Sequence, residues 1–320
     1  MKEYILFGTG WRAMFYVRIA THLTSLLRIN AIYTRRKDFS LPGFYITDNA
    51  EDALSKPHDA VIVASGRIGF LETMKYLDKR GETILTETSF LTLTDEELKE
   101  VEDIKGYTLE QYPHFPLFSA VIKATERIGK VDQLKLSSLH NHHASAILRA
   151  ILKENSIPKD ISAVDFPSST IKTAGRGGRT KNGEREEYIR KIRIIRYPSN
   201  KLFIHDFSTN TYHSTLIRDK IEVRGERGIV DENGVRYVGK DGETIVMPFV
   251  FHRDTEFFAS TMTLSHITLG SEVVFSNPFY PSPLSDDEIA VALLLQAFDK
   301  GCLEYSIQDG VLDVRIGRLL

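Results

Sequence analysis

A glycine-rich turn separates the first apolar run of the chain, residues 4–7, from its first helical pattern. The turn reads Gly8-Thr9-Gly10-Trp11-Arg12-Ala13, which is G-x-G-x-x-A. In this order the first glycine permits a tight turn, the second lets the backbone approach a pyrophosphate, and the small third residue lets the helix pack on the strand. The helix start adds amide donors and partial positive charge. We therefore expect residues 8–12 to hold a dinucleotide; the alternative is a glycine turn without a ligand.

The first third of the chain alternates short apolar runs with helical patterns. Residues 30–33, 59–64 and 83–86 have the composition of buried strands, and residues 15–26 and 71–79 have helical spacing. Parallel strands need such helical crossovers between them. The alternation therefore predicts a mainly parallel sheet with helices.

The pattern changes near residue 116. Two helical patterns then flank a strand pattern, and strand and hairpin patterns dominate after residue 188. Capping boxes that begin at Thr94 and Ser285 predict the starts of two further helices. The predicted class is α/β, with a Rossmann dinucleotide-binding domain over residues 1–116 and an α+β domain with a large, mostly antiparallel open sheet over residues 117–320.

A basic segment follows the second predicted strand. It reads Tyr33-Thr34-Arg35-Arg36-Lys37, and the first acid after it is Asp38. An NAD site usually places a carboxylate on the ribose 2′-hydroxyl about 20 residues beyond the glycines, whereas an NADP site places Arg near the 2′-phosphate. We therefore expect Thr34, Arg35 and Arg36 to bind a 2′-phosphate, with NADP(H) preferred and NAD(H) possible. The alternative is a solvated turn.

Composition excludes several classes of protein. The 41 Lys and Arg residues balance 43 Asp and Glu residues, so the sequence has no excess of positive charge of the kind that nucleic-acid-binding proteins carry. Cys302 is the sole cysteine, so an internal disulfide and a thiolate metal cage are excluded. No apolar stretch approaches the roughly 18 residues of a membrane helix, and no signal-like segment follows Met1. We expect a cytoplasmic protein that binds a small molecule, with no nucleic-acid, membrane or metal partner.

Further segments resemble the glucose-fructose oxidoreductase/inositol dehydrogenase (Gfo/Idh/MocA) family. Residues 59–65 resemble its D-x-V-x-V-A-T strand, and residues 81–87 resemble its G-K-H-V-x-x-E segment. Gln111-Tyr112 resembles its (N/Q)-Y pair, and residues 221–235 resemble its I-x-V-x-G-x-x-G hairpin. With the G-x-G-x-x-A turn, the similarity extends over most of the chain.

The resemblance implies a Rossmann domain joined to a domain whose open sheet commonly forms the oligomer interface, and hence a homodimer or homotetramer. It also implies hydride transfer between NAD(P) and a sugar, a cyclitol or a related carbonyl or alcohol. By the same resemblance, the far ribose lies near Ser65, Gly66 and Arg67, the nicotinamide near Glu87, and the substrate near Gln111 and Tyr112.

This chain lacks most of the catalytic residues of the family pattern. Thr88 replaces the lysine of the E-K-P motif, which helps to move the substrate proton. The D-x-G-x-H-x-x-D motif keeps only its histidine, as His143, because Leu139 and Ala146 replace the acids. A histidine has a usual pKa that suits proton exchange near neutral pH. We therefore expect His143 to be the catalytic acid or base and His142 to contact the substrate.

Three interpretations of these missing catalytic residues stay open. His143 alone can serve hydride transfer as the acid or base. The substrate can instead hold a C=N or C=C bond that needs less help, as in thiazolinyl imine reductase and biliverdin reductase, which resemble the family and also lack the lysine. The chain can also bind a nucleotide without turnover, as a regulatory subunit.

Two basic or histidine-rich segments remain. His140 stands near His142 and His143, but without neighbouring acids or thiols, so a metal site is not expected. A glycine-rich loop over residues 174–183 follows Lys172 and contains Arg176, which are candidate contacts for an anionic substrate. A solvated loop is the alternative.

Overall fold

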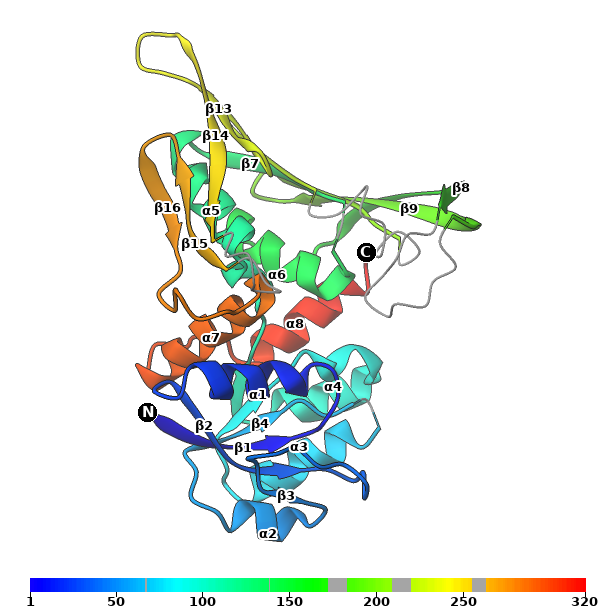
Figure 1. Ribbon diagram of the computed structural model, residues 1–320. Helices are drawn as coiled ribbons and strands as arrows, with labels where there is room; N and C mark the ends of the chain where they lie inside the picture. Colours follow the sequence, from blue (N-terminus) through cyan, green and yellow to red (C-terminus); the bar gives the residue numbers. More distant parts are fainter. Residues whose placement is uncertain (67, 138, 172–182, 209–219, 255–262) are drawn as a thin grey trace. The chain divides into compact units, whose positions relative to one another are not determined.

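The chain forms two compact units (Figure 1). The computed structural model describes residues 1–66, 68–137, 139–171, 183–208, 220–254 and 263–320. Unit 1 contains Met1–Pro116, Arg253–Ser265 and Asn277–Val311, and unit 2 contains Leu117–His252, His266–Ser276 and Leu312–Leu320. Unit 1 therefore joins the N-terminal third to a segment near the end of the sequence. The functional division into residues 1–116 and 117–320 stays a prediction.

Unit 1 contains a six-stranded parallel sheet with the order β3-β2-β1-β4-β5-β6. Its strands are β1 (Lys2–Phe7), β2 (Leu27–Tyr33), β3 (Ile46–Thr47), β4 (Ala60–Val63), β5 (Ile84–Thr86) and β6 (Gly106–Thr108). All four residues of β4 are fully buried. Parallel strands that are covered on both faces have such continuous apolar runs. The predicted parallel sheet is confirmed.

Helices connect and cover the strands of unit 1. They are α1 (Ala13–His22), α2 (Ala50–Leu54), α3 (Phe70–Lys79), α4 (Asp95–Glu102), α7 (Asp286–Asp299) and the start of α8 (Ile307–Gly317), with short 3₁₀ turns at Ser89–Thr92 and Tyr112–His114. Both capping boxes are present: Thr94 caps α4 with Glu97, and Ser285 caps α7 with Glu288. Each box satisfies orphan backbone donors at its helix start, so these two predictions are confirmed.

The direction in which the strands are added reverses between β1 and β4. The chain adds β2 and β3 on one side of β1 and then adds β4 on its other side. In such doubly wound sheets, ligands bind outside the carboxyl ends of the strands at the reversal point. Gly8 follows β1 there, and Ala64 follows β4.

Unit 2 contributes most of a ten-stranded sheet with the order β16-β15-β14-β13-β12-β11-β7-β10-β9-β8. The strands are β7 (Val131–Leu136), β8 (Asp160–Ile171), β9 (Arg185–Tyr197), β10 (Lys201–Asp206), β11 (Ile221–Gly225), β12 (Gly228–Asp231), β13 (Gly234–Val238), β14 (Thr244–Arg253), β15 (Leu264–Leu269) and β16 (Glu272–Ser276). β7 and β10 run parallel, whereas the neighbouring pairs from β11 to β14 and from β8 to β10 run antiparallel. The predicted large, mostly antiparallel sheet is confirmed.

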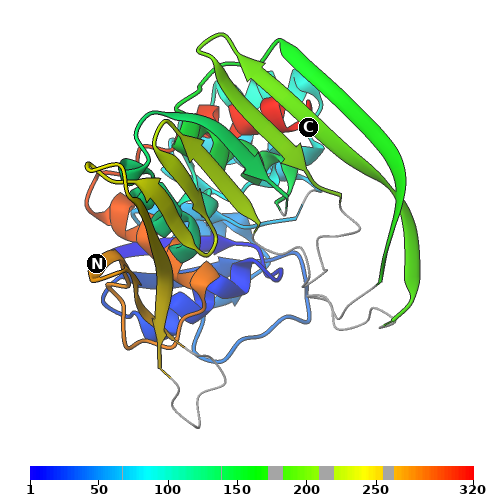
Figure 2. The ribbon, with the colours of Figure 1, turned by 90° about the horizontal axis from the view of Figure 1, so that it is seen from above.

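The two faces of this sheet differ. Helices α5 (Pro116–Ala124) and α6 (Asn141–Leu152) lie on one face (Figure 1). Inward side chains on that face, such as Leu134, Ile195 and Phe203, are fully buried. The opposite face exposes apolar side chains, among them Val164 and Val246. Figure 2 shows β8 and β9 as a long, curved hairpin at one edge of the sheet.

Two details differ from the sequence predictions. Strand β8 was not expected, because Pro167 interrupts its pattern; the strand is tolerated because it lies at the edge, where a missing backbone N–H costs little. Helical spacing predicts a helix through residue 26, but α1 ends at His22 and β2 begins at Leu27. The apolar residues Leu23 and Leu26 are instead buried in the connection.

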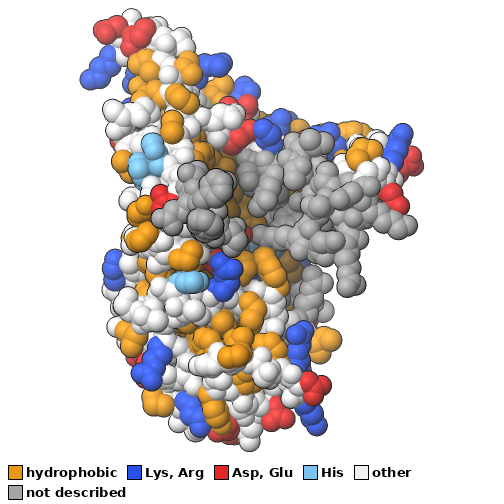
Figure 3. Space-filling model, in the orientation of Figure 1, with side chains coloured by type: hydrophobic (Ala, Val, Ile, Leu, Met, Phe, Trp, Pro, Cys, Tyr) orange, Lys and Arg blue, Asp and Glu red, His pale blue; other side chains and the backbone are white. Residues whose placement is uncertain are grey.

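The surface carries charges of both signs. In the space-filling view, Lys and Arg side chains are interspersed with Asp and Glu side chains, and hydrophobic side chains lie between them (Figure 3). This distribution agrees with the near-zero net charge of the sequence. Among the described residues, no helix combines the length and the apolar character that crossing a membrane requires.

Candidate functional site

The turn after β1 has two glycines with different surroundings. Gly8 has a φ of 129°, and a Cβ atom there would lie 2.4 Å from the carbonyl oxygen of Ala64. Its amide donates to the carbonyl oxygen of Tyr33 at 3.0 Å. By contrast, a Cβ atom on Gly10 would meet nothing within 4 Å. The protein itself therefore requires glycine at residue 8, whereas Gly10 faces open space.

The residues expected at a 2′-phosphate lie at the end of β2. Thr34 is buried, and its hydroxyl lies 2.9 Å from the hydroxyl of Thr9 and also accepts from the amide of Arg36 at 3.2 Å. Arg35 donates through Nη2 to the carbonyl oxygen of Ile68 at 2.7 Å. The side chain of Arg36 is exposed and makes no hydrogen bond or ion pair within the described residues. Arg36 is therefore the residue of this segment whose charge is available to a ligand.

Arg12 and Glu87 form an ion pair that the sequence analysis did not indicate. Arg12 Nε donates to Glu87 Oε1 at 2.9 Å, the Tyr16 hydroxyl donates to the same oxygen, and Arg12 Nη1 lies 3.8 Å from Asp287 Oδ1. Burial is the largest single influence and lowers the pKa of Arg12, but Glu87, Tyr16 and Asp287 together raise this pKa above its usual range. Burial and Glu87 also raise the pKa of Tyr16 well above its usual range.

This ion pair occupies two residues that were expected to contact the cofactor. The guanidinium of Arg12 lies against Glu87, and its Nη2 is buried with no hydrogen-bond partner in the described ranges. The two residues are separated by 75 positions in the sequence. Only the fold, which brings the start of α1 next to the end of β5, places them together, so no local pattern signals the pair.

The end of β4 supplies the next expected contacts. Within the described part of the chain, the Ser65 hydroxyl is buried without a hydrogen-bond partner, and a Cβ atom on Gly66 would meet nothing within 4 Å. Arg67 lies outside the described residues. Trp11, on the turn after β1, is 54% exposed and packs edge-on against Phe15, with 4.5 Å between ring centroids.

The residues after β6 include a buried acid that the sequence analysis missed. Glu110 is 1% exposed, and its Oε1 accepts from the amide of Tyr112 at 3.0 Å. Burial raises the pKa of the Glu110 carboxyl to about 8. Beside it, Gln111 Oε1 is buried without a hydrogen-bond partner, and Tyr112 stacks on Phe115. The available signal was an acid that directly precedes the (N/Q)-Y pair.

In unit 2, the expected catalytic histidine lies in the first turn of α6. His142 and His143 are both buried, and their ring centroids lie 3.8 Å apart. Burial, followed by the neighbouring His143 and His140 rings, holds the pKa of His142 well below its usual range. His142 is therefore neutral near pH 7, and its Nδ1 is buried with no hydrogen-bond partner among the residues that the structure describes.

A further buried histidine faces the same side of the sheet. His205 on β10 is 1% exposed, and its Nε2 lies 3.0 Å from the carbonyl oxygen of Leu139. Burial lowers the pKa of His205 to about 4. A neutral His205 that donates to this oxygen fixes the backbone just before α6. No motif in the sequence indicated this residue, because its partner is a backbone atom 66 positions away.

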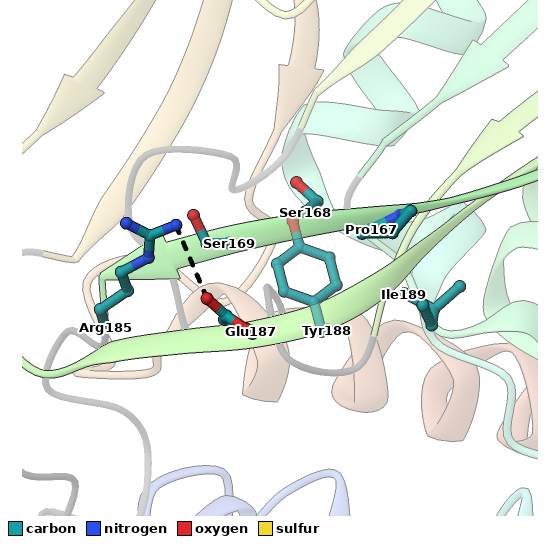
Figure 4. Close-up of a pocket in the computed structure, with 7 residues that line it drawn as sticks. All are labelled: Pro167, Ser168, Ser169, Arg185, Glu187, Tyr188 and Ile189. Atoms are coloured by element: carbon teal, nitrogen blue, oxygen red, sulfur yellow. Dashed lines mark ion pairs between the residues drawn. The ribbon is translucent and has the colours of Figure 1, made fainter.

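One cavity lies on the β8–β9 hairpin (Figure 4). Its volume is about 690 Å³, and Ser168, Tyr188 and the Arg185–Glu187 ion pair contribute to its lining. Ser168 and Tyr188 are directly paired across the two strands. The candidate substrate contacts Lys172 and Arg176 belong to the connection between these strands and lie outside the described residues.

Comparisons with known proteins give a fold but no sequence family. No family model matches the chain, and no curated protein matches it. Solved structures of oxidoreductases share its fold. These include levoglucosan dehydrogenase in complex with NADH and levoglucosan, which is 13% identical with a TM-score of 0.64 over 99% of this chain and 95% of that one.

Two other matches have similar values. An oxidoreductase from Agrobacterium radiobacter in complex with NAD⁺, L-tartaric acid and magnesium is 14% identical, with a TM-score of 0.62 over 99% of this chain and 94% of that one. An oxidoreductase from Thermotoga maritima is 14% identical, with a TM-score of 0.61 over 99% and 95%. Identities this low establish the fold alone, and the fold expected from the family resemblance is confirmed.

Proposed function

We propose that the chain is an NAD(P)-dependent oxidoreductase that transfers a hydride between a nicotinamide cofactor and a small polar substrate. The turn after β1 is the observation that carries this proposal. Gly8 is fixed against Ala64, while Gly10 and Gly66 both face open space at the reversal point of the sheet. A pyrophosphate needs this kind of close backbone approach. Solved oxidoreductases of the same fold hold NAD⁺ or NADH.

We infer a sugar, a cyclitol or a related carbonyl or alcohol as the substrate. One matching structure holds levoglucosan with NADH. The bound nicotinamide would supply or accept the hydride, and the chain would move the proton. His143 at the start of α6 is the proposed acid or base. Its neighbour His142 is uncharged at neutral pH, since burial disfavours the imidazolium.

We propose NADP(H) as the preferred cofactor. The exposed Arg36 supports this preference, because its guanidinium has no protein partner among the described residues and Arg matches phosphate geometry. The Thr34 hydroxyl is engaged by Thr9 and by the Arg36 amide. We assign it to holding the basic turn in place.

Two further candidate functions rest on one observation. Thr88 follows Glu87, whose carboxylate is engaged by Arg12 and Tyr16, so the segment that matches E-K-P offers no free proton carrier. The first candidate is reduction of a C=N or C=C bond, which needs less proton transfer from the protein. The second is nucleotide binding without turnover.

Thermal shift and turnover assays test these proposals together. A ligand at 100 times its Kd stabilises the folded state by about 2.7 kcal/mol. At equal concentration we expect a larger melting-temperature shift with NADPH than with NADH, and an equal shift with NADH would remove the 2′-phosphate assignment. NADPH oxidation with a carbonyl, an imine or neither then separates the oxidoreductase, the imine reductase and the non-catalytic protein.

We also propose a homodimer or homotetramer that assembles through the open face of the ten-stranded sheet. Val164 and Phe166 on β8 and Val246 and Val250 on β14 support this assignment, because they expose apolar surface on the face of the sheet opposite to α5 and α6. In the same proposal, residues 1–116 bind the nucleotide and residues 117–320 bind the substrate and the partner subunit, in the cytoplasm. Sedimentation of the full chain tests the assembly, and a monomer would contradict it.

A further inference from the structure

Unit 2 contains a second cavity, beside the start of α6. Its volume is about 410 Å³, within the range of about 300–1,000 Å³ that is usual for small-molecule sites. The polar and aromatic part of its lining comes from Asn141, Lys191, Arg193, Phe207, Ser208 and Arg318. The remaining lining residues are Leu and Ile. Three cations therefore surround a space large enough for a six-carbon sugar acid or sugar phosphate.

Two of these cations, Lys191 and Arg193, lie next to the same carboxylate. Arg193 donates through both terminal nitrogens to Asp165 on β8, the strand next to it. Asp165 is also the register partner of Lys191. One carboxylate thus serves two cations, and Lys191 makes no hydrogen bond or ion pair of its own within the described residues.

The neighbouring elements fix the position of these charges. Lys191 and Arg193 are two residues apart on β9, so both point to the same face of the sheet. The Arg193 guanidinium is held by Asp165, which leaves Lys191 as the cation that is free to meet a ligand. The first turn of α6 contains no acid and adds a small positive partial charge.

The cavity is connected to the expected proton donor through the sequence of α6. Asn141 lines the cavity and directly precedes His142 and His143 on the same helix. Asn141 Nδ2 donates to the carbonyl oxygen of Gly317 at 2.9 Å. Gly317 approaches α6 so closely that a Cβ atom there would lie 2.9 Å from the amide of His142. A ligand in the cavity therefore lies against the helix turn that carries His143.

We propose that this cavity binds the anionic group of the substrate, and that the substrate class is a sugar or polyol with a carboxylate or a phosphate. The inference rests on the oxidoreductase function proposed above and narrows its substrate. Lys191 is the specificity-determining residue, because it is the cation without a committed partner. The buried Phe207 contributes an apolar part of the lining on which the carbon skeleton of the substrate can pack.

The test is calorimetric titration of the full chain, saturated with NADPH, with D-glucose 6-phosphate, D-glucuronate and D-glucose. We expect at least one of the two acids to bind about tenfold more tightly than glucose, and Lys191→Met to abolish that preference. The matched control is Lys240→Met. Lys240 is exposed between β13 and β14 and lies outside this cavity, so removing it changes the net charge equally but leaves the preference intact.

The two acids distinguish a phosphate site from a carboxylate site by which of them binds more tightly. Equal binding of both acids and glucose would overturn the proposal, as would acid binding that Lys191→Met leaves unchanged. Failure of all three sugars to bind would also overturn it. In each case a normal melting-temperature shift with NADPH would leave the proposed oxidoreductase function standing, so the two failures are distinguishable.

Discussion

The turn after β1 and the first turn of α6 align with the two halves of the motif pattern that the sequence resembles, and they differ in how many residues match it. At the first, G-x-G-x-x-A survives, and each glycine has surroundings that explain it: Gly8 meets Ala64, and Gly10 meets nothing. At the second, only His143 remains, buried against His142. A turn that binds a cofactor needs a backbone geometry that few sequences can adopt. Catalysis depends on side chains, and the side chains that it requires differ from one substrate chemistry to another.

The catalytic half is tested most strongly by His143→Ala. If His143 moves the substrate proton, kcat should fall by about 10²–10⁴-fold, while the Kd for NADPH and the free energy of unfolding stay near wild type. Steady-state kinetics with the substrate found in the turnover panel measure this. His266→Ala, which removes a histidine elsewhere in unit 2, is the control. Unchanged turnover would move the proton transfer to another group.

Variants of the Arg12–Glu87 ion pair test whether Arg12 stabilises the fold or binds the cofactor. Arg12→Met should lower the free energy of unfolding by about 3–5 kcal/mol, because it leaves the buried Glu87 carboxylate without a counter-charge. Urea denaturation measures the loss. Arg12→Met combined with Glu87→Gln should recover part of the loss, since no unpaired charge remains. A single-variant loss under about 1 kcal/mol would show that solvent screens the pair.

The two glycines offer a matched comparison within one turn. Gly8→Ala should lower the free energy of unfolding by about 2–4 kcal/mol, because its φ is positive and its Cβ would overlap the Ala64 carbonyl. Gly10→Ala should stay within about 0.5 kcal/mol of wild type. Chemical denaturation of both variants tests the contrast. Equal losses would mean that the space near Gly10 is filled in solution.

Glu110 gives a pH dependence to the stability of the protein. Burial raises its pKa from the usual 4.5 to about 8, so between these values the folded state binds a proton that the unfolded state releases. The free energy of unfolding should therefore fall as pH rises through this window, by up to about 1.4 kcal/mol per pH unit. Denaturation across the window should show a flatter profile for Glu110→Gln. Identical profiles would contradict the buried, protonated carboxyl.

The sequence predicted what local patterns encode. The strand before Gly8 and the two capping boxes each depend on residues a few positions apart, and each appears where predicted. Strand β8 was missed because Pro167 counts against a strand unless the strand lies at an edge, and edge position is a property of the whole sheet.

The rest of the candidate site depends on contacts between distant residues. The pairing of Arg12 with Glu87 joins two segments 75 positions apart, and the bond from His205 to Leu139 joins segments 66 positions apart. The raised pKa of Glu110 comes from burial that the whole fold produces. Neither composition nor spacing contains these interactions, because each is created when separate strands and helices meet.

Calorimetric titration of NADPH into wild type and Gly10→Val tests the central claim most directly. Valine at residue 10 adds a side chain only to the open space of the turn, so the account predicts a fold as stable as wild type and NADPH binding weakened by at least about tenfold, or about 1.4 kcal/mol. Wild-type affinity in a folded Gly10→Val variant would contradict it and place the nucleotide, if it binds, elsewhere.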